Sequence, residues 1–568
     1  MAILSLNNYS DMKRLFVFFI LTILFSCCSK DNLEKRSGPP LVQCFSETDA
    51  LESFAQILSS ALYENEELRV FLKEEALKQY DRDYDVFFPF VKDHIFSSGK
   101  SFYDILSSYA QGLGLIDAIE KSVPKLTILI PDYSWINPDC FSVYYWDTSS
   151  NNVCIGYDDH ATSHRLYHNG ELLGLLPGTS IPTFPVLIVK SNERMDVSPA
   201  ATKGGLAYSF ADQAFDGADS YYTKGHIDGY LYNAHTDQRK DLFSEIGNFV
   251  AYNELNPISP SSVDAFNEFG TGYLSAAQRD YIFYGMSTTN TNYGVLNPYM
   301  RDLLYRIRFT KDALFRISDD TNDPNLSTIY TGRDDRPGFD EVLPRIWGNG
   351  NYEIHIQYYQ NLNNGSVAYI GANTYSISPS ELMYVSRIYY TFDWNFWGNN
   401  WSSYTIHSID IEPKWYYPGD KYNPLSLVNT AWNLATASDN IWLKVSEFDI
   451  SSTETITMSG SFKRSSSVSY NNNDGTWEKH GFGVSGTYGT EEVDNESFNI
   501  TRTYSSDELG DSWFSYMDNI IISSSTLQSV SGFQLKSIGN DYYSISYIPI
   551  DTRNEYSIQQ FLLNRKNR

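Results

Sequence analysis

The spacing of hydrophobic residues changes twice along this chain, and these changes limit the folds open to it. From Ser46 to about Ile119, apolar residues recur every three or four positions, which is the period of an amphipathic helix. After Val123 they form short runs or alternate with polar residues, which is typical of β-strands. After about Arg345 the helical pattern nearly disappears. The sequence therefore predicts an α+β multidomain fold, with a small helical bundle over 46–122, a mixed α+β domain over 123–345 and an antiparallel, β-sandwich-like domain over 346–568.

Capping signals mark where several helices begin. Ser46-Glu47-Thr48-Asp49 and Ser101-Phe102-Tyr103-Asp104 each place a hydroxyl three residues before a carboxylate, so the serine can accept a hydrogen bond from a first-turn amide. A helix between them is predicted over 66–80. In the middle of the chain, the pattern predicts helices over 261–269, 275–284 and 298–309, the last with Asn297 as its cap and Pro298 at its first position.

Short apolar runs and turn dipeptides predict the strands. The runs 125–130 and 185–190 resemble buried strands, and Asn169-Gly170 predicts a tight hairpin between two strands within 165–176. Farther on, Asn363-Asn364-Gly365 and Asn473-Asp474-Gly475 also predict hairpin turns. Strands are predicted over 352–358, 455–462, 482–488, 497–504 and 542–550.

The stretch from Met12 to Lys30 has the layout of an export signal. A basic pair is followed by an apolar run too short to span a bilayer, and then by Leu24-Phe25-Ser26-Cys27. This tetrapeptide resembles the lipobox of bacterial lipoproteins. The resemblance implies a signal peptide over 1–26, lipidation of Cys27 and a membrane anchor at that residue, with 27–45 as a tether. Lipidation at Cys28, a plain secretory signal and an uncleaved anchor remain alternatives, and translation begins at Met1 or at Met12.

Charge and cysteine content limit the partners and the compartment. The formal net charge is −27, and such an acidic surface argues against nucleic acid as a partner. Beyond the signal junction the chain has Cys44, Cys140 and Cys154. A bond between Cys140 and Cys154 and two free buried thiols are both consistent with this odd number.

An aromatic run is the strongest candidate for a ligand-binding surface. Rings and polar side chains alternate at Asp393, Trp394, Trp397, Asn399 and Trp401. Aromatic faces stack on sugar rings, while amides and carboxylates bind sugar hydroxyls. The alternative is that these tryptophans fill the β-core.

Candidate metal ligands are weaker. Asp212, Asp216, Asp219 and Asp228 lie among glycines and are oxygen donors of the kind that bind calcium, but they match no EF-hand loop and arise easily by chance in an acidic chain. The histidines at 160, 164 and 168 are interpreted as surface residues of a strand pair rather than as metal ligands. No other cofactor is expected. The chain has none of the common hydrolase or phosphate-loop motifs.

Together these features predict a lipid-anchored protein of the cell envelope, at the outer membrane or cell surface, that binds or adheres to glycan or protein ligands without catalysis. Two alternatives remain. One is a pore-forming protein, because 455–470 and 481–490 alternate weakly and are rich in Ser, Thr and Gly. The other is an extracytoplasmic hydrolase that uses a pair of carboxylates.

Overall fold

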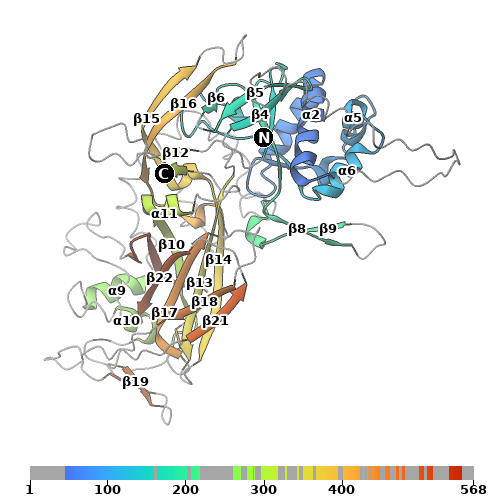
Figure 1. Cartoon of the computed structure of the whole chain (residues 1–568). Coiled ribbons are helices and arrows are strands. Elements are labelled where there is room, and N and C mark those ends of the chain that lie inside the picture. The colour runs from blue at the N-terminus through green and yellow to red at the C-terminus, as the bar shows by residue number, and fades with distance from the viewer. Residues whose placement is uncertain are drawn as a thin grey trace, which may run out of the picture. The chain divides into compact units, whose positions relative to one another are not determined.

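The structure is a computed structural model of the chain (Figure 1). It describes residues 45–158, 163–178, 180–200, 206–217, 260–269, 278–285, 287, 296–317, 326–328, 342–344, 350–362, 366–393, 401–422, 427, 432–433, 437–447, 455–460, 468–471, 476–479, 498–503, 508–515 and 537–552. The fold is mixed α/β, with mostly antiparallel sheets and few helices.

A six-stranded sheet organises the first part of the described chain. Its strands, in spatial order, are β1 (Asp85–Phe87), β2 (Leu126–Leu129), β7 (Val186–Ser191), β3 (Cys154–Tyr157), β4 (Ser163–His168) and β5 (Glu171–Pro177). Neighbouring strands are antiparallel except for β3 and β7, which are parallel. The runs predicted to be buried strands are β2 and β7, and both are buried along almost their whole length.

Five helices accompany this sheet: α2 (Glu47–Glu64), α3 (Glu66–Leu77), α4 (Phe88–Val91), α5 (Phe102–Tyr109) and α6 (Leu115–Ser122). The predicted caps are confirmed. Ser46 Oγ accepts a hydrogen bond from the Asp49 amide at 3.2 Å, and Ser101 and Asp104 form a complete capping box. The predicted second helix ends three residues earlier than expected, at Leu77.

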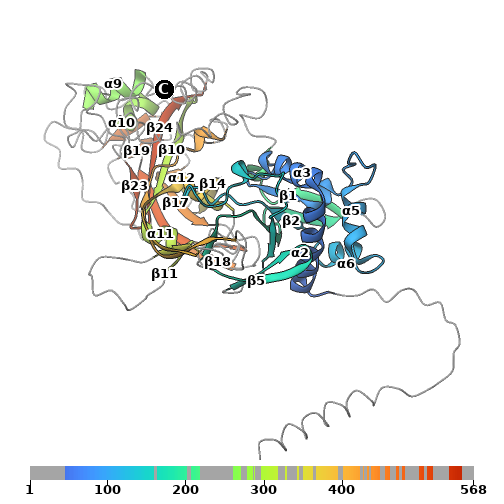
Figure 2. The same ribbon diagram turned by 90° about the horizontal axis from the view of Figure 1, so that it is seen from above.

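These helices do not form a bundle of their own, as the sequence had suggested. Strand β1 lies inside 46–122 and pairs with β2, and α2 packs on β3, β4 and β7 as well as on α5 and α6. Figure 2 shows α2 beside the sheet that contains β2 and β5. Gln56 Nε2 on α2 donates to the carbonyl of Gly170 at 2.8 Å, and the Gly170 amide donates to Ser59 Oγ at 2.9 Å. The sheet therefore covers part of α2, beside α5 and α6, which a helical period alone does not reveal.

The predicted hairpin connects β4 to β5. Asn169 and Gly170 both have positive φ, 50° and 78°, as the tight turn requires. The turn lies directly against α2, because a Cβ built on Gly170 would lie 2.4 Å from Ser60 Oγ.

We expect Gly170→Ala to destabilise the protein by about 1–2 kcal/mol, mainly through left-handed backbone strain, because the Ser60 hydroxyl can rotate away from most of the clash with the new methyl. Gly99→Ala is the matched control. Gly99 also has a φ of 78°, but no heavy atom lies within 4 Å of its built Cβ, so only the strain of about 1 kcal/mol applies. Urea unfolding of both variants measures the difference, and equal losses would show that the contact with α2 contributes nothing.

The later part of the described chain is built from antiparallel sheets. One has the order β14 (Val367–Ile377), β13 (Tyr352–Leu362), β17 (Ala437–Glu447), β22 (Glu508–Ser515). A second has the order β10 (Met300–Phe309), β24 (Tyr543–Asp551), β23 (Ile538–Gly539). A third has the order β11 (Leu326–Thr328), β12 (Val342–Pro344), β16 (Ser403–Pro413), β15 (Met383–Asp393), with β6 (Ser180–Pro182) also paired to β16.

Three two-stranded pairs and several short helices complete the elements. The pairs are β8 (Met195–Pro199) with β9 (Leu206–Phe210), β18 (Thr455–Gly460) with β21 (Phe498–Thr503), and β19 (Val468–Asn471) with β20 (Thr476–Lys479). The helices are η1 (Val143–Tyr145), η2 (Gln213–Phe215), α9 (Pro260–Phe269), α10 (Gln278–Tyr284), α11 (Lys311–Arg316), α12 (Pro379–Leu382) and η4 (Pro418–Asp420).

Most predicted strands of this part are confirmed, namely those that became β13, β18, β21 and β24. The predicted strand 482–488 lies outside the described residues, as do the turn residues 363–365 and 473–475, although the flanking strands pair as hairpins. Helices α9 and α10 are also confirmed, and the residues predicted to cap α10, before Gln278, are not described.

The predicted helix over 298–309 is wrong, because Met300–Phe309 is strand β10. Asn297-Pro298 has the appearance of a helix start, but Tyr305 to Phe309 alternate apolar and charged residues. Every position except Tyr305, where the register shifts, pairs with a residue of β24, such as Ile307 with Ile545, more than 200 residues away in the sequence. Pairing with a distant strand outweighs the local helix signal here.

Two further observations concern the helices and the cysteines of the described residues. None of the helices in the described ranges combines the length and the hydropathy that a membrane-spanning helix needs. Cys140 and Cys154 are both free and buried, so of the two alternatives left by the sequence the structure has the free thiols.

Burial raises the pKa of both thiols, which suppresses the reactive thiolate. We therefore expect iodoacetamide to leave Cys140 and Cys154 unmodified in the native protein and to alkylate both in urea. Mass spectrometry of the digested protein distinguishes the two states. Protection that persists in urea without a reductant would instead indicate a disulfide.

Candidate functional site

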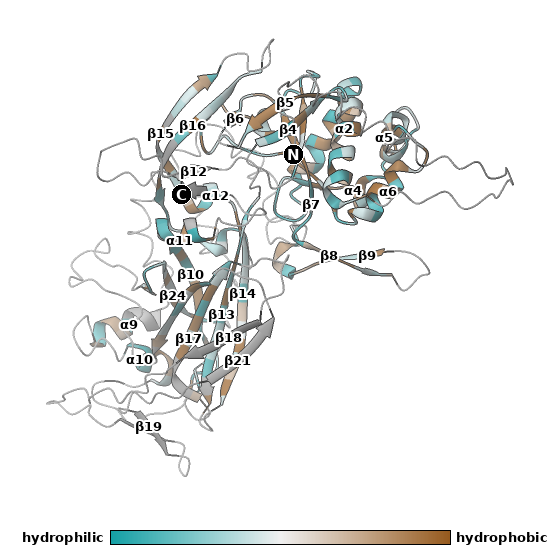
Figure 3. Ribbon diagram, viewed as in Figure 1, coloured by the Kyte–Doolittle hydropathy of each residue, from teal (hydrophilic) through white to brown (hydrophobic). Residues whose placement is uncertain are grey.

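The two faces of the four-stranded sheet differ in chemistry. One face of β13 carries Tyr352, Ile354, Ile356 and Tyr358, all buried in the apolar core. Figure 3, coloured by hydropathy, shows both hydrophilic and hydrophobic residues on the ribbons of this sheet. On this side Tyr547 of β24 donates a hydrogen bond to Tyr358 Oη at 3.1 Å and stacks on Phe514 of β22. The opposite face of β13 carries Glu353, His355, Gln357 and Tyr359. Only one face is therefore used for the apolar core.

An aromatic row crosses the polar face. Tyr369, Tyr359, Trp442 and Trp513 lie on β14, β13, β17 and β22, and each is the direct cross-strand partner of the next. Direct partners point to the same face of a sheet. The ring centroids of Trp442 and Trp513 are 5.5 Å apart with planes 19° apart, and those of Tyr359 and Tyr369 are 5.6 Å apart.

The ends of this aromatic row reach solvent. Trp513 is 41% exposed and Tyr369 is 39% exposed, while Tyr359 and Trp442 between them are buried. Four adjacent strands place the outer residues about 14 Å apart. Polar side chains occupy the next positions on the same face, including Gln357 and the ion pair of Lys444 with Glu508.

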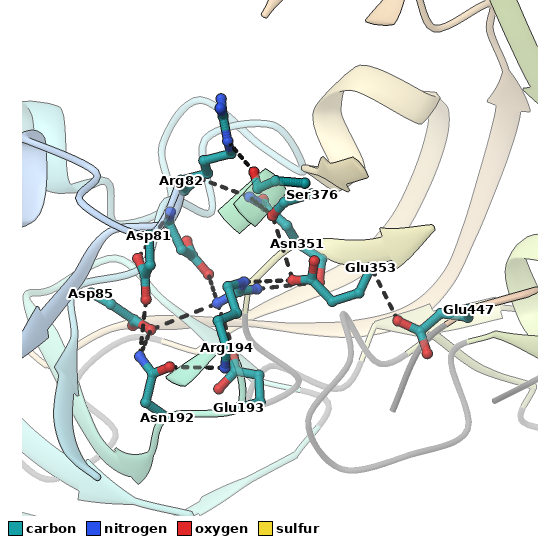
Figure 4. Close-up of polar contacts among 12 residues, drawn as sticks. Asp81, Arg82, Asp85, Asn192, Glu193, Arg194, Asn351, Glu353, Ser376 and Glu447 are labelled. Atoms are coloured by element: carbon teal, nitrogen blue, oxygen red, sulfur yellow. Dashed lines mark hydrogen bonds and ion pairs between the residues drawn. The ribbon is translucent and has the colours of Figure 1, made fainter. Parts of the chain in front are cut away.

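A second feature is a buried ion network that joins segments distant in sequence (Figure 4). Asp81, Asp83 and Asp85 follow α3 and enter β1, and Asn192, Glu193 and Arg194 form the connection from β7 to β8. Asn192 Nδ2 donates to Asp81 at 2.9 Å and to Asp85 at 3.3 Å. Lys190 Nζ lies 3.2 Å from Asp85 Oδ2 and 3.0 Å from Glu193 Oε1.

Arg194 is the centre of this network. Its fully buried guanidinium lies 2.5 Å from Glu353 Oε1, 2.5 Å from Glu193 Oε1 and 3.4 Å from Asp83 Oδ2. Through Glu353 it ties the connection between β7 and β8 to β13. Gly350 covers the network closely, because a Cβ built there would lie 2.4 Å from Asp83 Oδ2.

Burial and neighbouring charges shift the pKa values of the ionisable groups in the network. Burial raises the pKa of Asp85 and of Asp81, and it raises the pKa of Glu353 to about 8. Burial opposes the charge on Arg194, but Glu353, Glu193 and Asp83 raise its pKa above the usual value. Because all these side chains are nearly inaccessible, a polymeric substrate cannot reach the carboxylates. This arrangement favours a structural role over the carboxylate-pair hydrolase considered from the sequence.

The residues predicted to form a sugar-binding surface do not all behave as expected. Trp401 is only 6% exposed, with its ring centroid 4.8 Å from that of Phe184 and 5.1 Å from that of His168, so it offers no free stacking face. Asp393, at the end of β15, accepts a hydrogen bond from Thr405 Oγ1 at 2.6 Å. Trp394, Trp397 and Asn399 lie outside the described residues.

Two of the four predicted calcium ligands are described, and both accept hydrogen bonds from protein groups. Asp212 caps η2 by accepting from the Ala214 amide at 2.8 Å, and it also accepts from Thr374 Oγ1 at 2.9 Å. Asp216 accepts from Gln213 Nε2 at 3.4 Å. Asp219 and Asp228 are among the residues that the structure does not describe.

The histidines at 164 and 168 lie on β4, as the hairpin predicts, and His160 is not described. The prediction of a surface position is wrong for His164, which is buried. His168 Nδ1 lies 3.0 Å from the Val153 carbonyl oxygen, and its ring packs on Tyr63.

The sequence matches no protein-family model, and comparison with curated proteins and with solved structures found no significant match.

Proposed function

We propose that this chain is a lipid-anchored protein of the cell envelope, at the outer membrane or cell surface, that binds glycan or protein ligands without catalysis. In this proposal Cys27 carries the lipid, 27–45 is the tether, and the sheets of the later part form a β-sandwich-like binding module. The observation that carries the proposal is the aromatic row on the polar face of the four-stranded sheet.

The row has the chemistry that a sugar requires. The stacked pair of Trp442 and Trp513 offers one partly exposed indole, and Tyr369 offers an exposed ring at the other end. Ring faces stack on the apolar side of a pyranose, and a neighbouring carboxylate can bind a hydroxyl. Of the polar groups beside the row, Glu508 has a 45% exposed side chain and can do so, whereas Gln357 and Lys444 are buried. The proposal thus places the sugar-binding surface on β14 and β22 rather than on the run that ends at Trp401.

A glycan array probed with the chain from Asp31 onward tests this proposal. We expect binding to a subset of glycans, and we expect Trp513→Ala and Tyr369→Ala each to weaken it by about 3- to 10-fold, the loss of one stacking contact. Tyr145→Ala is the control, because Tyr145 is 67% exposed and belongs to η1, which is no part of this sheet. Glycan binding that is insensitive to Trp513 and Tyr369, or no binding to any glycan, would contradict the proposed surface.

A further inference from the structure

The buried ion network holds more carboxylates than cations. Within the described chain its cations are Lys190 and Arg194, and its carboxylates belong to five residues, Asp81, Asp83, Asp85, Glu193 and Glu353. If all five were ionised, three negative charges would remain in excess in a region almost closed to water. The two cations already lie between the carboxylates. Because an uncompensated buried charge is strongly unfavourable, protons must balance the excess.

The contacts indicate which carboxylates take up these protons. Burial opposes the charge of Glu193, but the two cations beside it lower its pKa. Asp85 and Glu353 each have one buried oxygen, Oδ1 and Oε2, to which no group in the described ranges donates a hydrogen bond. Burial raises the pKa of these two carboxyls and of Asp81. Three protons on these groups would balance the three excess charges.

Glu353 is the member that changes its charge nearest to neutral pH. Ionisable side chains face it from each element packed against it: Arg194 and Glu193 from the connection between β7 and β8, Asp83 from the segment before β1, Glu447 from β17 and Tyr422 from the segment after η4. Of these only Arg194 is a cation. Burial, Glu193 and Asp83 outweigh it and raise the pKa of Glu353 to about 8.

We propose that the buried ion network is a proton-dependent clamp, in which Glu353 carries a proton while β13 is held to the connection between β7 and β8 and releases it when this contact opens. The neutral carboxyl still accepts a hydrogen bond from Arg194 Nε, which lies 2.5 Å from Oε1. The clamp joins two separate sheets, since β7 belongs to the six-stranded sheet and β13 to the four-stranded sheet.

The sign of the pH dependence follows from the proton that Glu353 takes up. In the open form its carboxyl has the ordinary pKa of 4.5, so at neutral pH the open form is ionised and the closed form is protonated. The contribution of Glu353 to closing is complete below pH 4.5 and is lost as the pH rises to about 8. Acidification from pH 8 to pH 6 therefore tightens the clamp.

Hydrogen exchange of the unaltered protein at pH 6 and pH 8, measured by mass spectrometry and corrected for the intrinsic effect of pH on exchange, tests the clamp. Two amides report on it. The Arg194 amide donates to Asn192 Oδ1 at 2.8 Å, and the Glu353 amide donates to Glu447 Oε1 at 2.9 Å. We expect the protection of both to fall at least 10-fold from pH 6 to pH 8, because release of one proton changes an opening constant about tenfold per pH unit. Equal protection at both pH values would overturn the proposal.

Variants assign the pH effect to the network. Glu353→Gln keeps the shape of the side chain and the acceptor for Arg194 but has no proton to release, so we expect the pH effect at the Arg194 amide to shrink about 10-fold. Asp85→Asn should shrink it in the same way, and it serves if Glu353→Gln does not fold. Glu120→Gln is the control, because Glu120 is paired with one cation, Lys92, at 2.7 Å, and it should keep the full effect. A full effect in both network variants, or its loss in Glu120→Gln, would overturn the assignment.

Discussion

Replacing Arg194 by methionine should cost about 3–5 kcal/mol of folding free energy, the largest loss we expect from a single side chain. The substitution keeps an unbranched side chain of similar length but removes the cation that contacts Glu193, Glu353 and Asp83. Removing one partner of a buried ion pair is costly because the other charge remains buried without compensation. Urea unfolding of the variant and of the unaltered protein measures the loss.

Two further variants separate the network from a general effect of losing an arginine. Arg165→Ala removes an ion pair with Glu52 on the surface, where water screens the charges, so we expect little change. Glu353→Gln in the Arg194→Met background should restore part of the stability. With a pKa of about 8, Glu353 takes up a proton on folding at neutral pH, and this uptake costs free energy that the glutamine avoids. An unfolding midpoint for Arg194→Met equal to that of Arg165→Ala would mean that the network contributes nothing to stability.

Local features of the fold were predictable from the sequence. Ser46, Ser101 and the Asn169-Gly170 turn act through hydrogen bonds and dihedral angles within a few residues, and the structure has each of them as expected. The alternation from Tyr352 to Tyr358 likewise identified β13, because period-two burial is a property of the strand itself.

The predictions that failed concern features that depend on residues far away in the sequence. Residues 300–309 form a strand because β24 lies beside them, and the sequence does not show that pairing. Arg194 and Glu353 meet across 159 residues, so no local motif indicates the ion network. In a chain with 69 acidic residues, sequence alone could not select Asp83, Asp85 and Glu193.

The aromatic row was missed for the same reason. The 44 tyrosines and 11 tryptophans of the chain suggested a recognition surface, but only strand register determines which rings share a face. The sequence directed attention to a local run of tryptophans, and Trp401 in that run packs against Phe184. Tyr359, Trp442 and Trp513 come from three separate strands, so their alignment appears only once the sheet is assembled.

Replacing Cys27 by alanine should abolish lipid labelling of this protein, because the proposed anchor depends on one thiol. A diacylglycerol thioether brings two acyl chains, and each buried methylene contributes about 0.8 kcal/mol, which together make attachment effectively permanent. Without the thiol no such bond forms. Cys28→Ala is the matched control, since the adjacent cysteine has nearly the same surroundings in the sequence.

Labelling with a palmitate analogue, followed by mass spectrometry of the first residue, measures the outcome for both variants. We expect Cys28→Ala to keep the label and to begin at acylated Cys27, while Cys27→Ala carries no label. The reverse pattern would move the anchor to Cys28 and shift the cleavage by one residue. If neither the unaltered chain nor the variants carried the label, the lipid anchor would be contradicted. The proposed location in the envelope would then lose its basis. Sugar binding by the aromatic row could still be tested with the isolated chain.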